Sequence, residues 1–163
     1  MIDVLILFWP VFVILLMIIA GLILVRTIVP KDRYPYSKKP RLVTKAEFRF
    51  YRALQRAVGG SYTIFAMVRI ADLLEVDSGT KNYRSWFNKI VGKHIDFVLC
   101  DERTLEPVLA IELDDSSHQR ADRIERDNFV DHAMESAGLP ILRIPVTRSY
   151  DSGEIRDQID ELI

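Results

Sequence analysis

The chain has 163 residues, which leaves room for one domain and an appendage. Its single cysteine, Cys100, excludes an intrachain disulfide and indicates a reducing compartment. The formal net charge of −1 hides an asymmetry: residues 26–69 carry eleven basic and two acidic side chains, and residues 70–163 carry eleven basic and twenty acidic ones. We expect a basic surface for lipid head groups or nucleic acid beside an acidic region that attracts cations, with an ordinary solvated surface as the alternative.

The first expected element is a transmembrane helix. The run Val4–Val25 contains no charged residue, and as a helix it would be about 33 Å long, close to the roughly 30 Å of a bilayer core. A cleaved signal peptide fits less well, since no basic residue precedes the run and no small-residue cleavage site follows it. Basic residues follow at once, so the positive-inside rule predicts a single-pass protein of the bacterial inner membrane with its N-terminus outside and its C-terminal domain in the cytoplasm.

We expect the anchor over residues 1–26, a basic linker with three prolines over 27–43, and an α/β domain over 44–163. The domain opens with a helix, because Thr44 and Glu47 form a capping-box pattern and Gly59-Gly60 ends the run. Its expected buried stripe is Tyr51, Leu54 and Val58. A basic stripe for nucleic-acid phosphates, or simply a solvated face, consists of Lys45, Arg49, Arg52 and Arg56.

Strands and helices then alternate along the domain. "SYTIFAMVRI" is typical of a strand, and "NYRSWFNKI" of a short helix whose Trp86 and Phe87 pack inward. "HIDFVLC" and "PVLAIELD" predict an antiparallel hairpin, in which Ile95, Phe97 and Leu99 share one face. A long helix to about Ala137, the strand "PILRIPV" and the amphipathic helix "SGEIRDQIDELI" complete a mixed α/β domain.

The end of the second hairpin strand gathers acidic residues. Glu112, Asp114 and Asp115 lie within four positions, with His118 just after them. The two-residue period of strands allows Asp96 to lie on the same sheet face as Glu112 and Asp114. Neighbouring carboxylates resist ionisation unless a positive charge lies between them, and a divalent cation is the usual one.

The order of these residues resembles the PD-(D/E)xK nuclease superfamily. An acidic helix residue is followed by Asp96 in one strand and by Glu112-Leu113-Asp114 at the end of the next. The text "IELDDSSHQRADRIERD…AGLPILRI" resembles the bacterial branch called domain of unknown function 2726, which is itself similar to the very-short-patch-repair endonucleases. The resemblance covers roughly residues 45–146. It implies a restriction-endonuclease-like mixed sheet flanked by helices.

The resemblance also implies roles for single residues. Asp96 and Glu112 would hold a magnesium ion, with manganese as a substitute, and the Leu113 carbonyl would be a further ligand. Glu47 would orient the site or bind water. The superfamily's lysine is here Asp114, which would be another metal ligand, with His118 as proton acceptor or leaving-group stabiliser. An alternative cation comes from Arg123, with Arg126 and Asp127 beside it.

Structural roles remain open for the same residues. Glu47 would then be only a capping acid, Asp114 or Asp115 would cap a turn, Asp127 would pair with Arg123, and His118 would be a surface histidine. His94 and His132 are interpreted as structural or solvated. The sequence favours a membrane-anchored, magnesium-dependent nuclease acting on DNA before RNA. The alternative is an inactive module that binds nucleic acid or a protein partner at the membrane.

Overall fold

The computed structural model describes residues 2–28, 34–114 and 121–163, and the side chains of 8–26, 34–114 and 128–163. The chain divides into two compact units, Met1–Lys39 and Pro40–Ile163. The first unit contains helix α1, Ile2–Ile28, with Pro10 inside it. Its segment Phe8–Arg26 has a mean hydropathy of 2.9 and no buried residue. By length and composition, α1 is therefore apolar enough to cross a membrane, as the sequence predicts.

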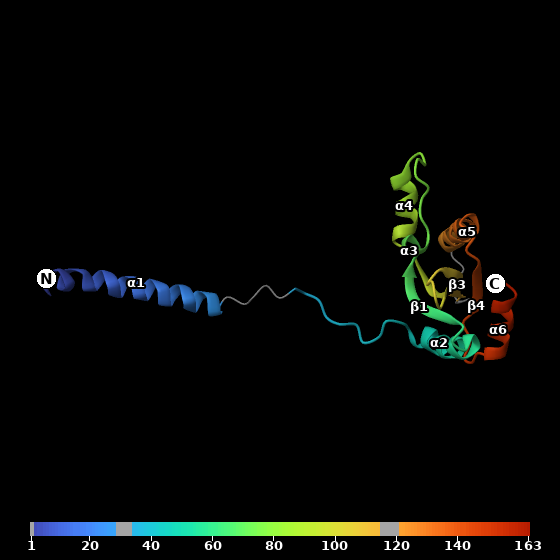
Figure 1. Ribbon diagram of the computed structural model, residues 1–163, viewed down its shortest axis with the longest axis horizontal. Helices are drawn as coiled ribbons and strands as arrows, with labels where there is room; N and C mark the ends of the chain where they lie inside the picture. The colour runs from blue at the N-terminus through green and yellow to red at the C-terminus, as the bar shows by residue number, and fades with distance from the viewer. Residues whose placement is uncertain (1, 29–33, 115–120) are drawn as a thin grey trace. The chain divides into compact units, whose positions relative to one another are not determined.

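The second unit is a mixed α/β domain, which confirms the predicted class (Figure 1). Its helices are α2 (Lys45–Val58), α3 (Ile70–Leu73), α4 (Tyr83–Val91), α5 (Ala121–Ser136) and α6 (Ser152–Asp160). Its strands are β1 (Tyr62–Arg69), β2 (His94–Asp101), β3 (Pro107–Asp114) and β4 (Ile141–Pro145). Helix α3 was not predicted, because Ile70 continues the apolar run of β1 and the run gives no sign of its end.

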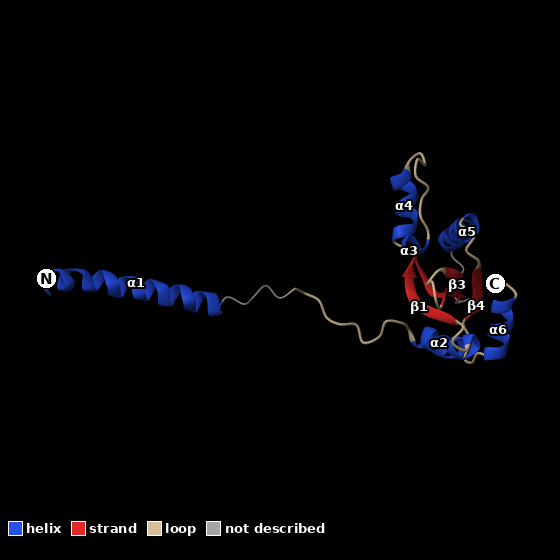
Figure 2. Ribbon diagram, viewed as in Figure 1, coloured by secondary structure: helices blue, strands red, loops and turns tan. Residues whose placement is uncertain are grey.

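The four strands form one sheet in the order β1-β2-β3-β4 (Figure 2). The pairs β1–β2 and β2–β3 are antiparallel, which confirms the predicted hairpin. Its turn is closed by Asp101, whose Oδ1 accepts hydrogen bonds from the backbone N–H groups of Thr104 and Arg103 at 2.8 and 2.9 Å. These bonds hold the pKa of Asp101 below its usual range. Strand β4 is parallel to β3, and α5 makes the crossover between them.

Each sheet face carries its own hydrophobic core. One core joins α2 and α6 to the sheet through residues such as Phe50, Phe97 and Ile155, and the Phe50 and Phe97 ring centroids are 5.5 Å apart. The other joins α3, α4 and α5 through residues such as Ile90 and Met134. Figure 1 shows α2 beside α6 and, across the sheet, α5. The sheet is therefore a middle layer, and the middle residues of its central strands, Phe97–Leu99 and Leu109–Ile111, are fully buried.

Helix α2 begins as predicted. The Thr44 N–H donates to Glu47 Oε2 at 2.8 Å, and the Glu47 N–H donates to the Thr44 hydroxyl at 3.2 Å. Gly59 ends the helix with a φ of 57°, the left-handed conformation that glycine adopts without strain. Leu54 is fully buried, Val58 is buried and Tyr51 is half-buried, so the predicted stripe is confirmed.

The exposure of Trp86 contradicts the prediction that Trp86 and Phe87 of α4 pack inward. The Trp86 side chain is 45% exposed, whereas Phe87 is half-buried. The Lys89 ammonium lies 4.1 Å from the centre of the Trp86 ring, so a cation on the surface covers part of the indole. Lys89 follows Trp86 by three positions, and residues at this spacing lie on the same face of a helix.

The regular alternation of the sheet breaks beside Asp96. Phe97 and Leu99 belong to the core under α2 and α6, but Ile95 belongs to the core under α5, so the prediction that all three share a face is wrong. The β1–β2 register pairs Ala66 with Phe97 and Val68 with Ile95, and omits the pair between them. At that gap Met67 has a φ of 56°, which is rare for a residue with a side chain. The change of face in both strands therefore coincides with the left-handed backbone of Met67.

Candidate functional site

Strands β2 and β3 separate at the end that carries the acidic residues. Their register ends at Phe97 and Ile111, although β2 starts three residues earlier and β3 runs three residues further. We call His94–Asp96 of β2 and Glu112–Asp114 of β3 the fork. Across it, the Leu113 N–H donates to Asp96 Oδ2 at 2.9 Å. A side-chain carboxylate therefore takes the place that a backbone carbonyl holds in a regular ladder.

The Leu113 peptide faces the same side as Asp96. The Ala110 N–H donates to the Pro140 carbonyl, and the Asp114 carbonyl accepts from the Val146 N–H, both at 2.9 Å. These two bonds run toward the side of β4. Successive residues of a strand direct their backbone groups to opposite sides, so those of Leu113 are directed toward β2. The Leu113 carbonyl is thus directed toward the β2 side of the fork.

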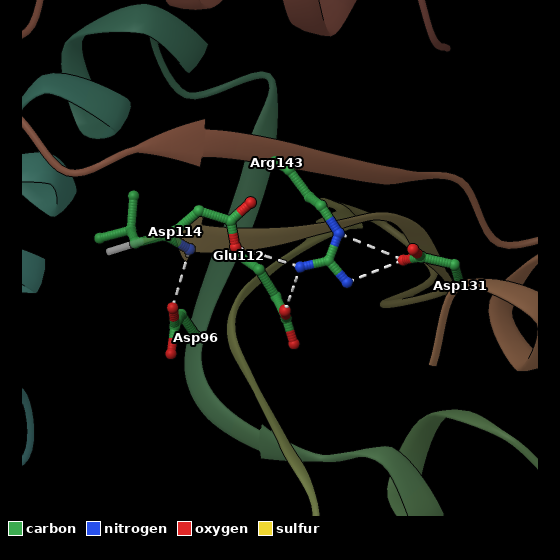
Figure 3. A network of polar contacts seen from close by, with 6 residues as sticks. Asp96, Glu112, Asp114, Asp131 and Arg143 are labelled. Carbon is green, nitrogen blue, oxygen red and sulfur yellow. Dashed lines mark hydrogen bonds and ion pairs between the residues drawn. The ribbon is translucent and has the colours of Figure 1, made fainter. Parts of the chain in front are cut away.

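A guanidinium from β4 joins the acidic residues of β3 (Figure 3). Arg143 is the register partner of Glu112. Its Nη1 donates to Glu112 Oε2 at 2.8 Å and to Asp114 Oδ1 at 3.2 Å. On the other edge of the group, Nη2 and Nε donate to Asp131 Oδ1 at 2.8 and 3.2 Å. One arginine thus bridges carboxylates of a strand and of helix α5.

The electrostatics of this group fix the charge of Arg143. Burial lowers the pKa of Arg143, but the hydrogen bonds that it donates to Asp131 and the charges of Glu112, Asp131 and Asp114 raise it by more, so the pKa lies above its usual range. The side chains of Arg143 and Glu112 are 24% and 16% exposed, whereas Asp114 and Asp131 are about half in solvent. The Glu112–Arg143 pair is therefore the most shielded of these contacts.

Arg143 and Asp131 are the residues that the sequence analysis missed. The positive charge among the acids was expected from a metal ion or from Arg123, with Arg126 beside it. The signal was present: Arg143 is the lone charge of "PILRIPV", the strand that follows the acidic one. A charge within a half-buried strand needs a partner, and Glu112 is the half-buried acid of the strand beside it.

The structure brings some predicted site residues together. Glu112 and Asp114 share Arg143, and Asp96 is held beside them by the Leu113 N–H. Within the described residues, no group of three or more His, Cys, Asp and Glu side chains is arranged to hold a metal ion. The metal set of Asp96, Glu112 and Asp114 therefore remains a prediction.

Other predicted residues have different surroundings or lie outside the described part of the chain. Glu47 caps α2, as its structural interpretation requires, and its catalytic role stays a prediction. The basic stripe of Lys45, Arg49, Arg52 and Arg56 is exposed along α2. His94 is exposed in the fork, and His132 Nδ1 lies 2.6 Å from the Asn128 carbonyl in its own helix. Asp115 and His118, and the side chains of Arg123, Arg126 and Asp127, lie outside the described residues.

Comparison with known proteins gives one result for the second unit. Residues 39–162 match the family described as "Protein of unknown function (DUF2726)". No curated protein matches the chain, and no solved structure does. The match spans the sheet, both cores and the fork, and it covers well over half of the sequence. The chain therefore belongs to the DUF2726 family.

Proposed function

We propose that the chain is a membrane-anchored nuclease with a restriction-endonuclease-like fold, which hydrolyses phosphodiester bonds of DNA with the help of a divalent metal ion. The observation that carries this proposal is the fork. Asp96 and Glu112 flank it on adjacent strands, and the backbone groups of Leu113 are directed toward Asp96. Oxygen ligands from two neighbouring strands, at a point where the strands stop pairing, suit a hard cation.

The chemistry of these donors fits magnesium, with manganese as its substitute. Magnesium is held by one or two carboxylates together with water and substrate phosphate, so Asp96 and Glu112 are a sufficient protein set, with Asp114 as a third. Once bound, the ion would acidify a water molecule and neutralise the charge that grows on the scissile phosphate. The resemblance to very-short-patch-repair endonucleases assigns proton acceptance or leaving-group stabilisation to His118. The superfamily resemblance assigns the orientation of the site to Glu47, and Arg123, with Arg126 and Asp127 near it in sequence, is the alternative cation.

Arg143 has a positioning role in this proposal. Its permanent charge lies against Glu112 and Asp114 and offsets the repulsion between these two acids. Its contact with Asp131 ties the fork to helix α5. Asp96 is oriented separately, because one of its oxygens accepts the Leu113 N–H. The two acids are thus held by different groups before any substrate arrives.

The proposed location follows from the charges that flank α1. Basic residues follow the apolar segment, while Asp3 alone precedes it among charged residues, so the second unit would lie on the cytoplasmic side of the inner membrane. Chromosomal DNA would then lie in the same compartment as the second unit. The exposed stripe on α2 is the proposed contact for its phosphates.

The test uses the full chain in detergent micelles with labelled single- and double-stranded DNA and RNA, in magnesium, manganese or a chelator. We expect cleavage to depend on the metal and to be abolished by Asp96→Asn and by Glu112→Gln. Asp114→Asn should reduce the cleavage rate. His118→Ala should lower the cleavage rate more than it lowers the affinity for metal. Glu102→Gln, an exposed acid in the β2–β3 turn, is the matched control. Metal should also raise the melting temperature of the parent and not that of the two inactive variants.

A second function is favoured by a specific observation. Arg143 already places a positive charge between Glu112, Asp114 and Asp131, so the acids have a structural explanation without a metal ion. The domain would then be an inactive module that binds nucleic acid or a protein partner at the membrane. A parent protein that neither cleaves nor gains thermal stability from metal, but still binds DNA, would select this function and reject the nuclease.

A further inference from the structure

We propose that the start of α2 is a docking site for anionic lipid head groups, an inference that rests on the proposed insertion of α1 in a membrane. A hollow of about 710 Å³ opens there. We call it the basic hollow, and its lining residues are Arg41, Leu42, Val43, Lys45, Phe48 and Arg49. The proposal concerns a surface that the nuclease proposal does not use for chemistry.

The basic hollow combines apolar and cationic side chains. Leu42 and Phe48 are 73% and 51% exposed, which is unusual for large apolar side chains of a domain with two well-filled cores. Arg41, Lys45 and Arg49 are exposed around them. A lipid interface has this composition: phosphates accept hydrogen bonds from the cations, and apolar side chains enter the boundary between head groups and acyl chains.

Two contacts hold the hollow in place. The Phe48 ring stacks on Tyr51 with centroids 6.4 Å apart, and Tyr51 stacks in turn on the buried Phe97 at 6.1 Å. Arg49 Nη2 donates to the Thr147 carbonyl at 3.5 Å. One apolar and one cationic group of the hollow are therefore anchored to the folded domain, so little order would need to be gained on binding.

The sequence keeps this surface near the membrane. Sixteen residues separate Ile28, the last residue of α1, from Lys45, the first of α2. Fully extended, they span at most about 58 Å. They contain Lys31, Arg33, Lys38, Lys39 and Arg41 against one acid, Asp32. A linker this short gives the basic hollow a high effective concentration of lipid. The basic residues of the linker are also attracted to an anionic lipid surface.

Lipid fits the hollow better than nucleic acid does. Phosphates of DNA would engage the cations but would leave Leu42 and Phe48 in water. Arg52 and Arg56, further along α2, are exposed cations outside the hollow and remain available to nucleic acid. The basic stripe would then have two uses, with lipid at its start and substrate phosphate at its end.

The test measures whether residue 48 of the full chain contacts lipid. Phe48→Cys carries an environment-sensitive fluorophore in nanodiscs of phosphatidylcholine alone or mixed with phosphatidylglycerol, with quenchers on the lipid. Cys100 is buried, and burial raises the pKa of its thiol, so it competes weakly for the label. Phe65→Cys is the matched control, because Phe65 is an exposed phenylalanine of the same domain, 42% in solvent.

We expect lipid quenching at position 48 that requires phosphatidylglycerol, weakens as salt is added, and is lost when Arg41, Lys45 and Arg49 are all changed to Gln. Position 65 should not respond. Equal quenching at position 48 with and without the anionic lipid would overturn the proposal. So would a response at position 48 to a DNA oligonucleotide and not to the lipid. Neither readout requires cleavage, so failure of the nuclease proposal would leave this result intact.

Discussion

The two halves of the β2–β3 hairpin differ although the same two strands build both. In the paired half, residues 97–100 of β2 and 109–111 of β3 are apolar, and none is more than 4% exposed. In the fork, register pairing has ended, and the strands carry His94, Asp96, Glu112 and Asp114. In the paired half, backbone pairing and packing join β2 to β3. In the fork, the Leu113–Asp96 hydrogen bond links these two strands, while each strand stays paired with its outer neighbour, β1 or β4.

The comparison shows where this fold tolerates charge. A carboxylate inside the paired half would lack solvent and a donor, whereas Asp96 at the fork receives the Leu113 N–H that the interrupted ladder leaves for it. Arg143 likewise supplies Glu112 with a hydrogen-bond donor. Because the hairpin opens there, acids on adjacent strands can reach solvent and hydrogen-bond donors.

The largest expected effect lies in the paired half. Phe97→Ala should lower the free energy of unfolding by about 3–5 kcal/mol, because Phe97 is fully buried against Phe50 and Tyr51 and its removal leaves a cavity. Phe65→Ala, the same change at an exposed position of β1, should cost about 0.5 kcal/mol or less. Urea denaturation measures both. Similar losses would show that the paired half is not the stabilising part.

An intermediate effect is expected in the fork. Arg143→Met should lower the free energy of unfolding by about 1–3 kcal/mol, because three acids lose their shared donor and are left repelling one another. These acids are Glu112, Asp114 and Asp131. Since they are partly exposed, the loss should be smaller than for a fully buried ion pair. The exposed Arg148→Met is the control. Adding Glu112→Gln to Arg143→Met should restore part of the loss.

The pH dependence of that loss has a definite sign. The folded-state pKa of Arg143 is raised, so its contribution to stability is present throughout the neutral range and would vanish only at strongly alkaline pH. The deficit of Arg143→Met should instead shrink as the pH falls into the acidic range, because protonation of the carboxylates ends both their attraction to Arg143 and their repulsion. A deficit that grows on acidification would contradict the assignment.

The smallest effect is expected at the strained position opposite Asp96. Met67 has a φ of 56°, which glycine adopts freely, and its side chain is 37% exposed. Met67→Gly should therefore change the free energy of unfolding by less than about 1 kcal/mol, with relief of strain offsetting the entropy of glycine. Ala66→Gly, one position earlier with no such relief, should be the more harmful change. Thermal melts of both variants decide the order.

The sequence predicted the parts of this fold that depend on local signals. Thr44, Glu47 and Gly59 mark the ends of α2, and alternating apolar residues on both sides of "DERTLE" mark the hairpin. The left-handed Met67 could not be predicted, because no glycine or asparagine marks the place and the strain arises from how β1 and β2 pair.

The candidate site was predicted in half. Glu112 and Asp114 were expected together from their spacing, and both contact Arg143. Asp96 was expected on their face from strand alternation, but the alternation breaks beside Asp96, and its link to β3 is the Leu113 N–H. Arg143 was missed because its contact with Glu112 depends on the register of a parallel pair, which is set by how α5 packs and not by a short turn. The exposure of Trp86 was missed for a similar reason, since its helical face depends on tertiary contacts.

The parallel pairing of β3 with β4 also bears on the order in which the domain folds. Asp96 and Leu113 are 17 positions apart and belong to one hairpin, whereas Glu112 and Arg143 are 31 apart, with helix α5 between them. Closing the longer loop costs more entropy and follows the shorter one. As the chain leaves the ribosome, the acids of the fork are thus assembled before the guanidinium that neutralises them. Until β4 arrives, the half-built domain presents a cluster of carboxylates that is open to any cation in its surroundings.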